Sequence, residues 1–306
     1  MEGKVSTATP VIAVEALEKR YGEVHAVRGV SFSIWPGTCV GLLGPNGAGK
    51  TTIMRMIMAL AQPTAGRLSL FGQAPSALGR TMRERVGLVP QEDNLDPDLS
   101  VRQNLEVYGR YFGRPSLELA ERVPRLLEFM QLGERAGAQV MQLSGGMKRR
   151  LIIARALIAD PELIILDEPT TGLDPQARVL IWRRLTDLKR EGKTLLLTTH
   201  YMDEAQRLCD RIIIIDGGKV LDEGPPRDLI DRHTRAYVVE IPKPLPTGLD
   251  EAGLERNDIG DAVLYYANDP VEVTRRLPPQ ATYTTRLANL EDVFLRLTGH
   301  GLREGG

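Results

Sequence analysis

The stretch from Gly44 to Thr52, GPNGAGKTT, decides how the rest of the chain is interpreted. It matches the pattern G-x-x-x-x-G-K-[ST] through Gly44, Gly49, Lys50 and Thr51. The apolar segment TCVGLL precedes it, and the helix-like segment IMRMIMAL follows it. Glycines let successive backbone N–H groups curve around phosphate oxygens, and the following helix directs its positive end at them. The stretch therefore predicts a phosphate-binding loop in an α/β fold.

Within this loop, Lys50 is expected to neutralise the β and γ phosphates of a nucleotide, and the Thr51 hydroxyl to ligate Mg²⁺. A chance glycine-rich turn is the alternative, but the strand before the loop and the helix after it are both as such a loop requires. The residues expected to line the phosphates are Gly44, Pro45, Asn46, Gly47, Ala48, Gly49, Lys50, Thr51 and Thr52.

A second group of chemical residues ends the apolar segment LIILDE. A buried strand there brings Asp167 and Glu168 to the carboxyl edge of the sheet, where ligands bind in open α/β folds. We expect Asp167 to hold Mg²⁺ through water and Glu168 to polarise an attacking water. Two acids that merely end a strand are a common alternative, and the phosphate-binding loop is what favours the catalytic interpretation.

The segment LSGGMKR, from Leu143 to Arg149, opens a helix rich in Ile, Leu and Ala. Ser144 is predicted to cap this helix, so that its hydroxyl and the N–H groups of Gly145 and Gly146 form an outward-facing anion site. If this helix and the phosphate-binding loop lie on separate subdomains, one chain cannot bring both to the same phosphate. The pattern therefore predicts a head-to-tail pair of subunits that share nucleotide.

In this order, GPNGAGKTT, LSGGMKR, LIILDEP and TTH resemble the motifs of the ATP-binding cassette ATPases of transporters. The resemblance covers residues about 11–230. It implies a P-loop fold with a RecA-like core, an antiparallel β part and a helical subdomain. It also implies a dimer, either a homodimer or a pair with a second such ATPase, in which two ATP molecules lie between phosphate-binding and signature loops.

The resemblance implies roles for four further residues. Gln91 corresponds to the glutamine that contacts Mg²⁺ and the attacking water and senses the membrane partner, and His200 to the histidine that bonds the γ phosphate. Tyr21 corresponds to the aromatic residue that stacks on adenine. Asp174, in TTGLDP, corresponds to the loop that crosses to the opposite subunit. Taken singly, a loop glutamine, a strand-end histidine and a tyrosine usually have ordinary structural roles.

Three longer phrases resemble the drug-resistance and nodulation-factor group of type-2 exporter ATPases: VPQEDNLDPDLSVRQNLEVYGRYFG, THYMDEAQRLCDRI and LEDVFLRLTG. This implies an ATPase subunit that powers export of a drug, lipid or polysaccharide-like cargo. The membrane-spanning permease would be a separate chain. We therefore expect this chain to lie in the cytoplasm, peripheral on the cytoplasmic face of the plasma (inner) membrane.

Composition restricts the possible partners. The 306 residues include 39 Lys and Arg against 40 Asp and Glu, a formal charge of −1 that gives no general attraction to nucleic acid. Apolar runs such as 212–215 are far shorter than the roughly 20 residues that span a bilayer, and the segment MEGKVSTATP does not resemble a secretory signal. Cys39 and Cys209 are expected to be buried, reduced thiols rather than a metal site or a disulfide.

Domain boundaries are predicted from shifts in pattern. Helices dominate between about residues 93 and 160, and Pro-rich joints around short strands begin near Asp231. The predicted organisation is an N-terminal tail (1–10), a nucleotide-binding domain (11–230, with a helical subdomain at about 93–160) and a small α+β accessory domain (231–306).

Local signals predict several helix ends. Ser100 and Gln103 form a capping box for a helix through Tyr111. Asn289 is expected to cap the last helix with Asp292 at its third position, and Gly299 to end it. Pro124 lies inside a helix-like segment, where it removes a backbone hydrogen bond, so a kink or a break is expected there.

Three alternative functions remain. A soluble cassette ATPase of DNA repair or translation usually has paired cassettes, a long coiled-coil insertion or zinc cysteines, and this sequence has none of them. A nucleotide kinase with the same glycine-rich loop would not need LSGGM. A regulatory module that binds ATP without hydrolysing it would not need Glu168 and His200.

Overall fold

The computed structural model describes residues 9–79, 84–247 and 249–299. The chain divides into two compact units, residues 1–223 and 224–306. The sequence-based boundary lay between 230 and 231. The difference is the short helix α8 (Pro226–His233), which contacts the last helix of the second unit and places Ile230 against its core. Residues 1–8 of the predicted tail lie outside the described part.

A six-stranded sheet forms the centre of the first unit, with the strand order β5-β6-β7-β3-β8-β9. Strand β3 pairs in parallel with β7 and β8, and β6 pairs in parallel with β5 and β7. The inner strands are almost wholly buried, which explains their continuously apolar sequences. The strands are β3 (Cys39–Leu43), β5 (Val86–Val89), β6 (Leu163–Asp167), β7 (Thr194–Thr198), β8 (Arg211–Asp216) and β9 (Lys219–Gly224).

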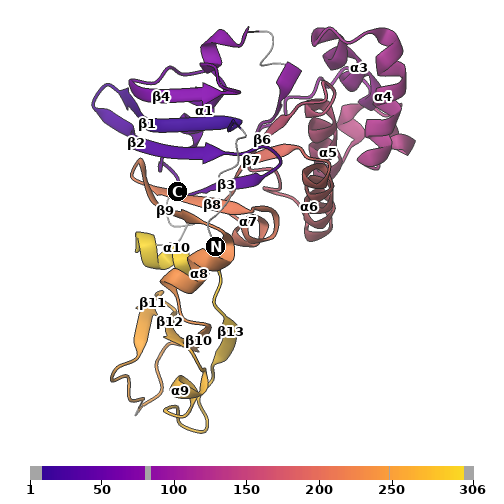
Figure 1. The fold of residues 1–306 in the computed structure, drawn as a ribbon. Helices are drawn as coiled ribbons and strands as arrows, with labels where there is room; N and C mark the ends of the chain where they lie inside the picture. Colours follow the sequence, from indigo (N-terminus) through magenta and orange to yellow (C-terminus); the bar gives the residue numbers. More distant parts are fainter. Residues whose placement is uncertain (1–8, 80–83, 248, 300–306) are drawn as a thin grey trace. The chain divides into compact units, whose positions relative to one another are not determined.

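A second, antiparallel sheet of three strands has the order β2-β1-β4, with β1 at Ile12–Tyr21, β2 at Val24–Ile34 and β4 at Ala65–Leu70. Ile12 lies opposite both Ile34 and Leu70, and all three are fully buried. Helix α1 (Lys50–Ile57) contributes four buried apolar residues to the same core. The two sheets therefore hold the first helix after β3 between them (Figure 1).

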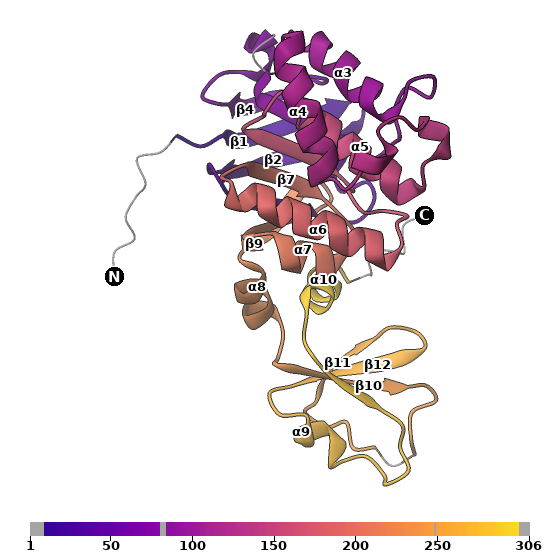
Figure 2. The ribbon, with the colours of Figure 1, turned by 90° about the vertical axis from the view of Figure 1, so that its right-hand side faces the viewer.

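Three helices form the predicted helical part: α3 (Val101–Tyr111), α4 (Ser116–Phe129) and α5 (Gly145–Ala156). Figure 2 shows them gathered beside the sheet. The capping box is confirmed, because Ser100 and Gln103 exchange side-chain and backbone hydrogen bonds. Helix α4 continues through Pro124, so the expected break is wrong. Burial of its apolar face, including Val123, offsets the one backbone bond that proline removes.

Two more helices belong to this unit, α6 (Pro175–Arg190) and α7 (Met202–Leu208), and Figure 2 shows both beside the strands. Short 3₁₀ turns occur at Pro75–Ala77, Gly133–Arg135 and Val140–Gln142. The unit thus has the predicted α/β core, antiparallel β part and helical part. No helix in the described ranges is both long and apolar enough to cross a membrane.

The second unit contains a four-stranded antiparallel sheet, β11-β12-β10-β13. One apolar cluster surrounds Val239 and Tyr265, and another surrounds Val238 and Tyr266, as expected for alternate residues on opposite faces. The predicted cap of the last helix is confirmed: Asn289 and Asp292 form a capping box, and Gly299 ends the helix. The remaining elements are β10 (Tyr237–Pro242), β11 (Glu255–Asp258), β12 (Ala262–Ala267), α9 (Val271–Thr274), β13 (Thr284–Leu287) and α10 (Leu290–Thr298).

The two cysteines are buried and free, and their sulfur atoms lie 3.9 Å apart. Cys39 begins β3, and Cys209 lies two residues before the neighbouring strand β8. Burial raises the pKa of the Cys209 thiol. Sequence separation concealed this contact, because it depends on which strands are neighbours in the sheet.

Candidate nucleotide site

The phosphate-binding loop joins β3 to α1 and curves back on itself. The Lys50 ammonium donates hydrogen bonds to the carbonyl oxygens of Gly44 at 2.7 Å and Pro45 at 2.9 Å. Gly49 has a φ of 104°, and a Cβ there would lie 2.6 Å from the Ala26 carbonyl oxygen. A side chain at this position would therefore both strain and obstruct the loop.

Most of the predicted site residues of the core line one cavity of about 360 Å³, whereas Gly44, Pro45 and His200 do not line it. This arrangement brings residues from β1, the loop before α1, and the ends of β5 and β6 to one place, at the carboxyl edge of the parallel sheet. The lining residues are Tyr21, Ala26, Asn46, Gly47, Ala48, Gly49, Lys50, Thr51, Thr52, Gln91, Asp167 and Glu168.

The Glu168 carboxylate lies where three segments converge. One of its oxygens accepts hydrogen bonds from the Gln91 amide at 3.1 Å and the Thr171 hydroxyl at 3.0 Å. The same oxygen lies 3.3 Å from Nδ1 of His200. The Glu168 backbone N–H donates to the Thr198 carbonyl oxygen at 3.1 Å. Gln91, Glu168 and His200, singled out separately in the sequence, therefore form one contact group.

The charges around Lys50 fit an anionic ligand. Burial lowers the pKa of Lys50, and the nearby carboxylates of Glu168 and Asp167 act in the opposite direction. The Thr198 hydroxyl also donates to the Asp167 carboxylate. A cation that has lost much of its hydration is stabilised by a phosphate group in the cavity, since a buried charge requires a partner. A nucleoside triphosphate satisfies this requirement.

The signature residues lie apart from this cavity. Ser144 caps α5 as predicted, since its hydroxyl accepts a hydrogen bond from the Met147 N–H at 3.3 Å. Neither Ser144 nor the following glycines line the cavity of their own chain. A Cβ on Gly145 would meet nothing within 4 Å, whereas one on Gly146 would lie 2.9 Å from the Ala177 side chain. The first turn of α5 therefore packs on α6 at one point and is open at another.

Two other predicted residues have local contacts. Asp174 caps α6, with its carboxylate accepting from the Ala177 N–H at 2.9 Å, and it does not line the cavity. Tyr21 lies on the cavity rim with 45% of its surface exposed, and the Lys19 ammonium is 4.8 Å from its ring centroid. An exposed ring face of this kind can stack on a planar base.

Three residues that hold the Gln91–Glu168–His200 contact group were not predicted from the sequence. The hydroxyls of Thr171 and Thr198 contact Glu168 or Asp167, and the paired threonines in EPTTG and LTTH were their only signal. The third is Arg149, whose guanidinium contacts backbone carbonyls on both sides of Gln91 and Glu168. Nothing in LSGGMKR distinguishes this buried arginine from its neighbours.

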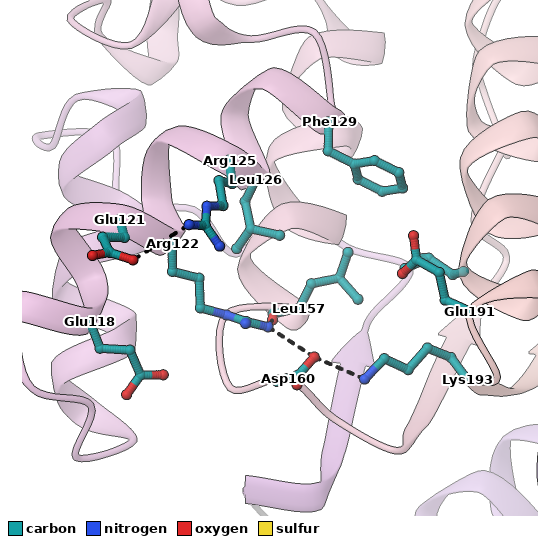
Figure 3. Close-up of a pocket in the computed structure, with 11 residues that line it drawn as sticks. Glu118, Glu121, Arg122, Arg125, Leu126, Phe129, Leu157, Asp160, Glu191 and Lys193 are labelled. Atoms are coloured by element: carbon teal, nitrogen blue, oxygen red, sulfur yellow. Dashed lines mark hydrogen bonds and ion pairs between the residues drawn. The ribbon is translucent and has the colours of Figure 1, made fainter.

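A different cavity, of about 530 Å³, lies between α4 and the core (Figure 3). The carboxylate of Asp160 is already paired there. The Asp160 carboxylate forms ion pairs with Arg122 at 3.1 Å and with Lys193 at 2.9 Å. The two cationic side chains approach it from opposite sides in Figure 3. Hydrogen bonds to Asp160 lower its pKa, the one from Lys193 most and the one from Arg122 less. We call this region the hinge cavity.

Comparison with known proteins matches both units to families. Residues 27–171 match the ABC transporter family, and residues 250–299 match the C-terminal domain of nodulation factor export protein NodI. A Nod factor export ATP-binding protein I from Ralstonia nicotianae is 49% identical over 309 aligned residues, covering 97% of this chain and 96% of that protein. Its counterpart from Burkholderia orbicola is 52% identical, covering 94% and 97%.

Solved structures give the same result for the first unit. An ATP-binding subunit of an ABC transporter has a TM-score of 0.66 and 31% identity, covering 72% of this chain and 92% of that chain. A dimeric post-hydrolysis state of the cassette MJ0796, bound to ADP and Pi, has a TM-score of 0.63 and 30% identity, covering 70% and 98%. The chain therefore belongs to the ATP-binding cassette family of transporter ATPases, as an ATP-hydrolysing subunit of the exporter group that contains the Nod factor export ATP-binding proteins I.

Proposed function

We propose that this chain hydrolyses Mg-ATP at the carboxyl edge of its parallel sheet, with Glu168 as the base that polarises the attacking water. The convergence of Gln91 and His200 on the Glu168 carboxylate, beside the phosphate-binding loop, supports this assignment. Hydrolysis then drives an exporter whose membrane-spanning permease is a separate chain.

In this mechanism the loop N–H groups and Lys50 bind the β and γ phosphates and neutralise charge that develops on them. Thr51, Gln91 and Asp167 line the same cavity, and their oxygens are the ligand type that Mg²⁺ prefers. When bound, the ion would offset phosphate charge and orient the triphosphate. Tyr21 stacks on the adenine and fixes the position of the nucleotide.

Glu168 accepts a hydrogen bond from the water and takes its proton as the water oxygen attacks the γ phosphorus, while the bond from that phosphorus to the bridging oxygen breaks and ADP leaves. The Gln91 amide and His200 ring, which already contact the carboxylate, limit its rotation and direct it toward the water. His200 also bonds the γ phosphate in this mechanism. Positioning and charge stabilisation supply most of the catalysis in reactions of this class.

A second copy, or another cassette ATPase, completes the site by supplying Ser144, Gly145 and Gly146 to the γ phosphate. The separation of these residues from the cavity of their own chain supports this arrangement. The similar cassette MJ0796 is described as a dimer in its post-hydrolysis state. Asp174, at the start of α6, reaches toward the partner in the same assembly.

The surface of α3 supports docking of an apolar helix from the permease. Val107 and Tyr111 lie one turn apart on the same helix face, and they are 51% and 66% exposed. The Tyr111 ring also contacts the rings of Tyr108 and Phe112, which contact each other. A permease bound here holds the chain at the cytoplasmic face of the inner membrane. Because its relatives are named for Nod factor export, we assign this chain's exporter a cargo of that class.

The replacement Glu168→Gln tests the proposal. It should lower the rate of phosphate release by about 10²–10⁴-fold, because the amide cannot take the proton. Its ATP affinity should remain, so ATP should drive the variant into a stable dimer. Phosphate release is measured on the chain with its permease, and dimerisation by size-exclusion chromatography with light scattering.

Glu191→Gln is the matched control, since Glu191 lines the hinge cavity instead. It should hydrolyse ATP like the unmodified protein. Normal phosphate release from Glu168→Gln would remove Glu168 from the role of base. A variant that stays monomeric in millimolar Mg-ATP would contradict the shared site. An unmodified protein that binds ATP but releases no phosphate would instead favour a regulatory module.

A further inference from the structure

We propose that Arg149 is a positioning residue for hydrolysis, which holds the backbone around Glu168 and the carbonyl of Gln91 as one unit attached to the signature helix α5. The inference rests on the proposed role of Glu168 as the base. The proposal gives a function to the one arginine of LSGGMKR, whose side chain is buried in its own chain.

One guanidinium reaches carbonyl oxygens on two separate segments. Its Nε donates to Pro169 at 2.7 Å, and its Nη2 donates to Asp167 at 2.8 Å and Glu168 at 3.0 Å. Its Nη1 donates to Pro90, and to Gln91 at 3.4 Å. A guanidinium has five N–H donors, so its whole donor capacity is directed at these carbonyls.

The three successive carbonyls that Arg149 binds lie where the backbone is strained. Glu168 has a φ of 46°, in the left-handed region that residues other than glycine rarely adopt. Such a conformation is unfavourable by itself and persists only where surrounding contacts impose it. Arg149 binds the carbonyls before, at and after this residue, while Thr198 binds its N–H. The direction of the Glu168 side chain therefore depends on these contacts.

Burial makes the contacts specific. Only 7% of the Arg149 surface is exposed, and burial lowers the pKa of this residue to about 10, against the opposing influence of Glu204 first and then Asp167 and Glu168. The guanidinium remains protonated at neutral pH. Lysine in its place has three donors on a single nitrogen, which cannot reproduce a planar fork that spans two segments.

The neighbouring Arg150 provides an internal contrast. It lies on the same helix, and its guanidinium also donates to two carbonyl oxygens, those of Met130 at 2.8 Å and Gln131 at 3.1 Å. Both of these acceptors follow α4 and lie outside the nucleotide cavity. Arg150 therefore anchors α5 within the helical part, whereas Arg149 anchors it to the catalytic strand. When closure of a dimer moves α5, Arg149 carries that movement to Glu168 and Gln91.

The test compares Arg149→Lys with Arg150→Lys in the full chain assembled with its permease. Arg149→Lys should lower kcat about 10- to 100-fold, the scale of a small misplacement of a reacting group. The KM for ATP should stay within about threefold, because the phosphate-binding loop is unchanged. Arg150→Lys should leave kcat within about threefold. Arg149→Gln, which buries no ammonium, is measured alongside as a second variant without the fork.

A double-variant cycle separates positioning from a general structural role. If Arg149 acts through Glu168, adding Arg149→Lys to Glu168→Gln should not lower the residual rate further. A structural role would lower it by the same factor as in the unmodified protein, and that result would overturn the proposal. A kcat near normal in both Arg149 variants would also overturn the proposal. Equal losses of kcat in Arg149→Lys and Arg150→Lys would do the same. A normal rate for Glu168→Gln alone would instead refute the base.

Discussion

The nucleotide cavity and the hinge cavity both contain lysine and carboxylate groups, but they differ in how these charges are satisfied. In the hinge cavity, Asp160 lies between Arg122 and Lys193, and its pKa is lowered. In the nucleotide cavity, the Lys50 ammonium donates to the backbone carbonyl oxygens of Gly44 and Pro45, and burial lowers its pKa while the nearby Glu168 and Asp167 carboxylates act in the opposite direction. In the hinge cavity the Asp160 carboxylate has two cations in direct contact, whereas the nucleotide cavity holds a partly desolvated cation beside an open volume.

This difference separates a binding site from a structural contact better than size does, because the hinge cavity is the larger of the two, at about 530 Å³ against about 360 Å³. A satisfied charge cluster gains little from a ligand, since binding would have to replace existing ion pairs. A partly desolvated cation beside an open volume gains more from an anion that binds in direct contact with it. Replacing matched residues in the two cavities tests this distinction.

The largest contrast is expected between two Lys→Met replacements. Lys50→Met should lower kcat/KM for ATP hydrolysis by about 10²–10³-fold, because it removes a positioned charge from the phosphates. Lys193→Met in the hinge cavity should change kcat/KM by less than about threefold. Steady-state phosphate release at varied ATP concentration measures both. Equal losses for the two variants would show that charge pairing does not distinguish these cavities.

A smaller effect is expected at the rim of the nucleotide cavity. Tyr21→Ala should raise the KM for ATP by about 3- to 10-fold with kcat nearly unchanged, because aromatic stacking contributes about 0.5–1.5 kcal/mol. Tyr21→Phe keeps the ring and should behave like the unmodified protein. ATP titrations of the three proteins provide the comparison. A KM that is unchanged in Tyr21→Ala would assign the exposed ring to another contact, such as its own Lys19.

The sequence predicted features that depend on short-range patterns. The capping residues Ser100, Ser144 and Asn289 all act as expected, because a cap is decided within three residues of the helix start. Residues 46–52 of the phosphate-binding loop and residues at the ends of β5 and β6 also line one cavity. Parallel strands place their carboxyl ends at one edge, so the order of motifs along the chain was sufficient.

Features that depend on tertiary contacts were not predictable from the same patterns. Pro124 predicted a kink or a break, and the break does not occur, because the packed apolar face of α4 keeps the helix continuous. The proximity of Cys39 and Cys209 depends on the adjacency of β3 and β8. Arg149 resembled any surface arginine of a helix, because no local signal reveals that its guanidinium meets carbonyls some 18 to 59 residues away.

The smallest effect on hydrolysis is expected from Asp160→Asn, which removes the central charge of the hinge cavity. Hydrolysis should stay within about twofold, while the free energy of unfolding at neutral pH should fall by about 0.5–1 kcal/mol, the upper range for a partly exposed ion pair. Both tryptophans, Trp35 and Trp182, lie within residues 1–223, so their fluorescence during urea denaturation reports on that unit alone. Glu121→Gln is the control, since its ion pair with Arg125 is highly exposed, and it should change stability less.

The pH dependence of this difference identifies its cause. Because the folded-state pKa of Asp160 lies below the unfolded value, the carboxylate contributes stability that is fully present above the unfolded pKa, about 3.9. That contribution is lost as the pH falls through the folded pKa. The stability gap between the unmodified protein and Asp160→Asn should therefore be constant from about pH 5 to 8 and close in stronger acid. A gap that persists unchanged below the folded pKa would mean that Asp160 stabilises the first unit through packing or through the shape of its turn. The two cavities would then differ in more than their charge balance.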